Sequence, residues 1–128
     1  MRVLIVVGAI AVCMSAGAFA EEVKPPSKEV QNAIEQHCAI QCITQDSDFI
    51  GASKKGGETA LKAKSMMLGC FAGGVLKVTG LHQGEQLKWC AIAAALSDSA
   101  VQNAVLNDNK DVMRSMVIGC SLGLKYEN

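Results

Sequence analysis

The chain is poor in aromatic residues, with three Phe, one Tyr and one Trp among 128 positions, and it contains only two prolines. A folded interior must therefore be built mainly from Leu, Ile, Val, Met and Ala. Strand signals are also missing, because no segment alternates apolar and polar residues and no Asn-Gly or Asp-Gly turn occurs. These absences argue against a β-sheet fold and favour an all-α domain.

A strong charge of one sign is lacking as well. Leaving Arg2 aside, eleven basic residues stand against twelve acidic ones. Without a basic patch, neither nucleic acid nor an anionic lipid surface is an expected partner. The near-zero net charge also argues against a membrane-active helical peptide.

Long apolar runs are absent beyond the first segment, "MRVLIVVGAIAVCMSAGAFA". One basic residue, a short apolar core, and Ala18 and Ala20 before Glu21 are typical of a secretory signal sequence. The core is too short to span a bilayer comfortably, which takes about 20 apolar residues. We expect residues 1–20 to be a cleaved signal peptide and residues 21–128 to form a single secreted domain.

Periodicity and end signals predict a bundle of five to six helices. Ser27, directly after Pro25 and Pro26, is a suitable N-cap, and Gly80 is a suitable helix stop. The expected helices cover 27–44, a short segment after Thr44 or Asp46, 58–77, the stretch "GEQLKWCAIAAALSDS", a short helix in "AVQNAVL", and a last helix from Asp108 or Asn109 to Lys125.

Catalytic patterns are weak. His37 and His82 are the only histidines, and neither lies in a nucleophile or metal motif. His37 beside Cys38 does not make a catalytic pair, because neighbouring residues of a helix do not face each other. The paired glycines of the chain lack the remainder of a phosphate-binding loop. We therefore expect no enzyme activity, no cofactor and no metal.

Five cysteines remain after the signal segment, an odd number. Secretion favours disulfide bonds over a zinc site made by Cys38, Cys42 and Cys70. Cys38 and Cys42 stand one helical turn apart, so either can reach a partner helix that carries Cys70. Cys90 and Cys120 then form a second pair. The spare thiol, if it is Cys42, leaves a Cys42-linked homodimer open.

A weak internal echo is also present. "CAI" occurs at residues 38–40 and 90–92, and "KSMMLGC" at 64–70 is similar to "RSMVIGC" at 114–120. The two offsets, 52 and 50 residues, fit either a duplicated helix pair or chance similarity between helices of like composition. The sequence alone favours chance.

Two segments, "CAIQCITQDSDFIGASKKG" and "CFAGGVLKVTGLHQGE", resemble the insect odorant-binding protein family, of the pheromone and general odorant-binding type. Cys38 matches the first cysteine of that family and Cys70 its second, while Gly74 occupies the place of the third. In the last segment, "DVMRSMVIGCSLGLKYEN", Cys120 matches the sixth cysteine and Asp111 stands where the fifth belongs. Cys90 would be the fourth, so the chain resembles a divergent member with fewer cysteines.

The resemblance implies a helical bundle around an apolar cavity that carries odorants, pheromones or lipid-like molecules without catalysis, with a membrane receptor as a further partner. It implies that a Cys90–Cys120 bridge survives and that Cys70 pairs with Cys38 or Cys42. Apolar residues beyond a simple helix stripe are the predicted cavity wall, although each of them also suits a plain core. These residues are Met67, Phe71, Val75, Trp89, Ile92, Leu96, Met113, Met116 and Val117.

An alternative interpretation is a secreted helical protein of seminal fluid, saliva or venom that acts through protein partners and binds no small ligand. An exposed helix face or a free exposed thiol would favour this alternative. A closed apolar void would favour the carrier.

Overall fold

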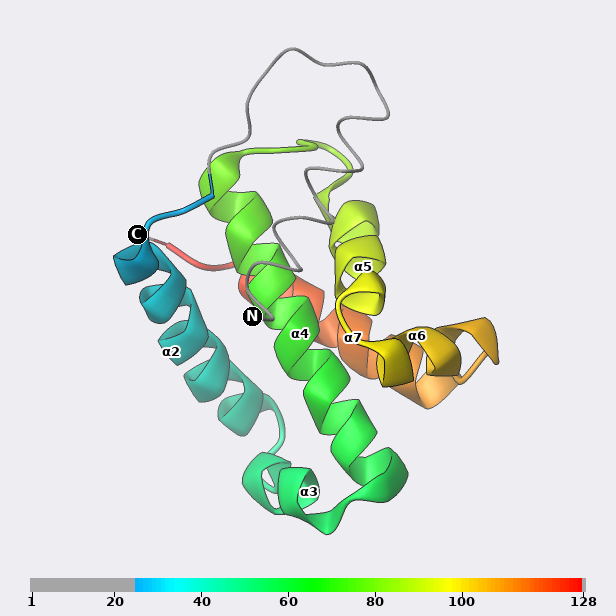
Figure 1. Cartoon of the computed structure of the whole chain (residues 1–128). Coiled ribbons are helices and arrows are strands. Elements are labelled where there is room, and N and C mark those ends of the chain that lie inside the picture. Colours follow the sequence, from blue (N-terminus) through cyan, green and yellow to red (C-terminus); the bar gives the residue numbers. More distant parts are fainter. Residues whose placement is uncertain (1–24, 128) are drawn as a thin grey trace.

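The computed structural model describes residues 25–127, so the signal peptide expected over residues 1–20 lies outside the described part. The described chain is all-α, as predicted, with six helices and no strand between residues 25 and 127. In the labels of Figure 1 the helices are α2 (Lys28–Gln45), α3 (Phe49–Lys55), α4 (Gly57–Thr79), α5 (Gln86–Leu96), α6 (Ser99–Leu106) and α7 (Lys110–Gly123).

The helix ends follow the predicted capping signals. The Ser27 side chain accepts the N–H of Val30 at the start of α2, and the Asn109 side chain accepts the N–H of Val112 at the start of α7. Gly80 ends α4 in the left-handed conformation with φ 71°. The start of α3 differs from the prediction, because its N-cap is Asp48 and not Thr44 or Asp46.

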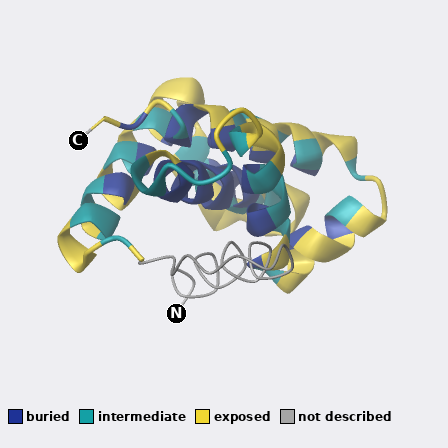
Figure 2. Ribbon diagram, turned by 90° about the horizontal axis from the view of Figure 1, so that it is seen from above, coloured by how far each residue is buried: buried dark blue, intermediate teal, exposed yellow. Residues whose placement is uncertain are grey.

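Helix α4 is the centre of the fold (Figure 1) and packs against α2, α3, α5 and α7, with its most extensive contact on α7. Its middle section is buried almost all round, from Leu68 to Leu76. The dark blue residues of Figure 2 accordingly concentrate on α4 and on the sides of the other helices that face it. A helix buried in this way must be apolar on every side, which explains why this stretch consists only of Gly, Leu, Cys, Phe, Ala and Val.

Two disulfides attach the outer helices α2 and α5 to the central helices α4 and α7. Cys38–Cys70 joins α2 to α4, and Cys90–Cys120 joins α5 to α7. The predicted Cys90–Cys120 pair is thus confirmed, and the alternative left open for Cys70 is decided in favour of Cys38. Each bond closes a loop of similar length, with sequence separations of 32 and 30 residues.

Glycines allow α4 and α7 to cross at backbone contact. A β-carbon added to Gly69 would collide with the carbonyl oxygen of Met116, and one added to Gly119 would collide with that of Met66. Gly119 stands 50 positions after Gly69, and Met116 stands 50 positions after Met66. The contact of Gly69 with Met116 and the contact of Gly119 with Met66 are therefore reciprocal.

The next turn of each helix repeats the arrangement. A β-carbon on Gly73 would lie 2.6 Å from the carbonyl oxygen of Cys120, and one on Gly123 would collide with the carbonyl oxygen of Cys70. The crossing therefore has approximate two-fold symmetry. The helix cost of the mid-helix glycine Gly73, about 1 kcal/mol relative to Ala, is explained by this close crossing.

The symmetry extends to whole units. The first unit, α2–α3–α4, and the second unit, α5–α6–α7, each consist of a cysteine-bearing helix, a short helix and a long cysteine-bearing helix, with equivalent disulfides. Chance similarity does not account for reciprocal contacts and equivalent bonds. We therefore interpret the sequence echo as a structural repeat of three helices.

Candidate functional site: two apolar grooves

The nine predicted wall residues do not surround one enclosed chamber. Phe71 and Val75, exposed to only 6% and 1%, lie in the core between α4 and its neighbours. They fill the interior, which is the plain-core role that the sequence left open for each of the nine. The hollows described below are grooves open to the surface.

Trp89 has a different environment from the other predicted residues. Its ring stacks on His82, with centroids 4.3 Å apart and planes inclined by 16°. The indole N–H donates to the carboxylate of Glu85 at 3.4 Å. Trp89 thus packs against the loop between α4 and α5, and it lines neither groove.

Five of the nine predicted residues converge on one groove in the second unit. Ile92 and Leu96 come from α5, and Met113, Met116 and Val117 come from α7. The groove has a volume of about 350 Å³. Its lining comprises Ala91, Ile92, Ala95, Leu96, Gln102, Val105, Leu106, Met113, Met116 and Val117.

Helix α6 completes this second groove, and the sequence analysis did not assign it a role. Asp98 caps α6 by accepting the N–H of Val101 at 3.1 Å. Val101 and Ala104 are buried against α4 and α7, which leaves Val105 and Leu106 on the groove side. The sequence "AVQNAVL" indicates this second apolar side of α6, because its apolar residues cover more of the helix than a single buried stripe requires.

The second groove contains little polar chemistry. Gln102 is its only lining residue with a polar side chain, and no charged residue lines it. Several rim side chains are apolar and exposed, with fractions of 47% for Leu96, 39% for Val117 and 74% for Leu106. The groove is thus suited to apolar matter and lacks groups for proton or group transfer.

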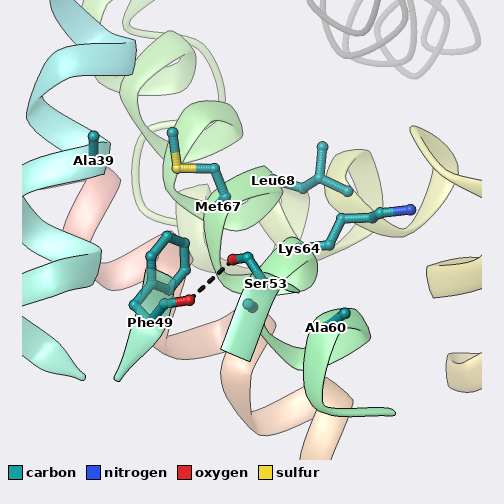
Figure 3. Close-up of a pocket in the computed structure, with 8 residues that line it drawn as sticks. Ala39, Phe49, Ser53, Ala60, Lys64, Met67 and Leu68 are labelled. Atoms are coloured by element: carbon teal, nitrogen blue, oxygen red, sulfur yellow. Dashed lines mark hydrogen bonds between the residues drawn. The ribbon is translucent and has the colours of Figure 1, made fainter. Parts of the chain in front are cut away.

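A groove of the same volume, about 350 Å³, lies in the first unit between α2, α3 and α4 (Figure 3). Met67, another of the predicted residues, lines it together with the ring of Phe49 and with Ala39 of α2. The Ser53 hydroxyl is at its edge and donates to the Phe49 carbonyl oxygen at 3.0 Å. The complete lining is Ala39, Phe49, Ser53, Ala60, Ala63, Lys64, Met67 and Leu68.

The two grooves occupy equivalent places in the repeat. Four lining positions of the first groove correspond to lining positions of the second at the offsets of the sequence echo. The pairs are Ala39 with Ala91, Ser53 with Val105, Ala63 with Met113, and Met67 with Val117.

The first groove differs from the second in charge. Lys64 contributes its stem to the lining, and in Figure 3 its ammonium group extends away from Phe49. The Lys64 ammonium lies 3.4 Å from the carboxylate of Asp98, the residue that caps α6. Both side chains are more than half buried. Because Lys64 belongs to α4 and Asp98 caps α6, this ion pair links the first unit to the second.

Cys42 is the spare thiol, and it is fully buried on the core side of α2. Burial raises the pKa of this thiol to about 11, because the thiolate would lose its hydration. A homodimer linked through Cys42 stays a prediction, and it would require α2 to expose this sulfur.

Between residues 25 and 127, no group of three or more His, Cys, Asp or Glu residues is placed to hold a metal ion. None of the six helices is long and apolar enough to cross a membrane. Comparison with protein-family models, with curated proteins and with solved structures found no match. The resemblance to odorant-binding proteins therefore stays a prediction from the sequence.

Proposed function

We propose that this chain is a secreted carrier that binds a small hydrophobic molecule without catalysis, and that the second-unit groove is its binding site. The observation that carries the proposal is the convergence of Ile92, Leu96, Met113, Met116 and Val117 on that groove. The sequence predicts all five as ligand contacts, and they belong to two different helices.

The energetics of the groove support a hydrophobic ligand. Leu96, Leu106 and Val117 expose apolar surface to water, and covering such surface is favourable by about 25 cal/mol per Å². A volume of about 350 Å³ is at the lower end of the range of about 300–1,000 Å³ for ligand pockets. The ligand is thus a small neutral molecule, such as a medium-chain alcohol or ester, whose polar end meets Gln102 or water.

Two further features support a carrier outside the cell. The two disulfides are typical of proteins in oxidising compartments, and the first twenty residues have the pattern of a signal sequence. Met113 and Met116 add adaptability, because a flexible thioether side chain fits ligands of different shape. A resemblance to odorant carriers agrees with this role.

A second candidate function rests on Leu106, which is 74% exposed at the groove rim. An exposed leucine next to an apolar groove is also typical of a surface that receives an apolar side chain of a protein partner. This alternative is the secreted effector without a small ligand.

Displacement of the neutral fluorescent probe N-phenylnaphthylamine by decanol tests the carrier proposal on the oxidised mature protein. We expect saturable binding that is lost in Val105→Trp, because the indole would fill the groove from α6. Ser53→Trp, the equivalent change in the first groove, is the matched control and should keep the binding. A folded protein that binds neither probe nor decanol would reject the carrier and favour the protein-partner alternative.

A further inference from the structure

We infer that the first-unit groove is a second binding site, selective for amphiphiles with a carboxylate head group, and that Lys64 recognises the carboxylate. This inference goes beyond the proposed function, which concerns a neutral ligand in the second-unit groove. The two statements can fail separately, because they concern different grooves.

The first-unit groove and the second-unit groove occupy equivalent positions in the repeat. The first groove has the same volume as the second and shares four lining positions with it. Its floor is apolar, with Phe49, Met67 and Ala39 in contact with the open space. If this architecture accommodates an apolar chain in one unit, the same frame is present in the other.

The difference in polar groups defines the ligand class. The second groove has Val105 where the first has Ser53, and it has no charged lining residue where the first has Lys64. An apolar chain that fills the space beside Phe49 and Met67 would have its head group near Lys64 or Ser53. A carboxylate complements the Lys64 ammonium, and a charge-assisted hydrogen bond is about twice as strong as a neutral one.

The ion pair with Asp98 leaves capacity for this contact. The Lys64 ammonium has three donors, and it makes a single contact with Asp98, at 3.4 Å. Asp98 also accepts the N–H of Val101, so its place is fixed by the α6 cap. A bound carboxylate would therefore share the ammonium with Asp98, and Asp98 would act as an internal competitor for Lys64.

The experiment titrates decanoate into the Val105→Trp protein, where the second groove is closed. Isothermal titration should show one equivalent of decanoate. Adding Lys64→Met should weaken decanoate about tenfold, as expected for loss of a charge-assisted hydrogen bond. In the chain with an open second groove, Lys64→Met alone should change decanol binding less than twofold. Lys64→Arg keeps the charge and should retain most of the decanoate affinity.

Asp98→Asn separates recognition from a structural role of the ion pair. Asn is as good an N-cap as Asp, so α6 should persist while the competing charge is removed. The inference predicts stronger decanoate binding in Asp98→Asn and weaker binding in Lys64→Met. Equal weakening by both changes would mean that the ion pair only holds the units together, and would overturn the inference.

Ser53→Trp gives an independent check in the chain with an open second groove. It should remove decanoate selectivity and leave decanol binding unchanged. If Val105→Trp alone abolished binding of both ligands in a protein that retains its helicity, the first groove would not be a site. If Val105→Trp left decanol binding unchanged, the proposed function would fail and the present inference would remain.

Discussion

Gly73 and Cys120 bring the backbones of α4 and α7 into direct contact. A β-carbon on Gly73 would lie 2.6 Å from the carbonyl oxygen of Cys120 and 3.1 Å from the backbone nitrogen of Leu124. Because the obstacles are backbone atoms, no side-chain rotation can relieve the collision. The two units of the repeat therefore meet at a contact that tolerates only glycine.

Gly73→Ala should destabilise the fold by about 1–3 kcal/mol, because the cost of overpacking exceeds the gain in helix propensity. Gly51→Ala in α3 is the matched control, because its β-carbon would meet only the movable side chain of Asp48. Urea denaturation measures both. A Gly73→Ala protein as stable as the parent would show that the crossing is looser than described.

The two disulfides should contribute equally to stability. Replacing Cys38 and Cys70 by Ala, or Cys90 and Cys120 by Ala, should each lower the free energy of unfolding by about 3–4 kcal/mol, because both bonds close loops of about 30 residues. Denaturation of the two double variants makes the comparison. A difference of several kcal/mol would contradict the equivalence of the two units.

The Cys42 thiol should resist alkylation in the folded protein. With a pKa of about 11 in a buried site, it is almost entirely protonated at pH 8 and inaccessible to iodoacetamide. Mass spectrometry should find no adduct without denaturant and one adduct in concentrated urea. Rapid native labelling would instead revive the Cys42-linked homodimer.

The same thiol should make stability depend on alkaline pH. Its folded pKa is raised from 9.0 to about 11, so the folded state favours the protonated form. The associated stability is fully present below pH 9 and is lost as the pH rises through 11. The difference in unfolding free energy between the parent and Cys42→Ala isolates this effect from titrating lysines. A difference that stays constant over this interval would refute it.

Leu106→Ser separates the two candidate functions. Leu106 is mostly exposed, so the change should alter stability by less than about 0.5 kcal/mol. It should weaken decanol binding only modestly, because most of the groove remains. If Leu106→Ser abolished binding to a partner protein, and if neither the parent nor the variant bound decanol, the protein-partner alternative would be supported.

Much of the fold could be predicted from local sequence. Ser27, Gly80 and Asn109 act through hydrogen bonds or a backbone conformation within a few residues, so their effect is legible in the chain. The start of α3 was harder, because the Asp46 side chain accepts the N–H of Asp48 and delays the helix. Such a local turn competes with the helix and is decided by small energy differences.

The site was only partly predictable, for a tertiary reason. Periodicity indicated which residues share a helix face, but the depth of Phe71 and Val75 depends on which helices cover them. Gly74 illustrates the same limit. Its missing side chain is explained by Ile34 of α2, whose side-chain carbon occupies the space of a β-carbon. That contact joins residues far apart in sequence.

Methionine methyl groups provide the most direct test of the central claim, that the second-unit groove binds a small hydrophobic ligand. Beyond residue 20 the sequence has four methionines, Met66 and Met67 in α4 and Met113 and Met116 in α7. In methyl spectra of the carbon-labelled protein, decanol should shift Met113 and Met116, which line the second groove, and leave the core residue Met66 in place. Unchanged Met113 and Met116 signals at saturating decanol would contradict the claim.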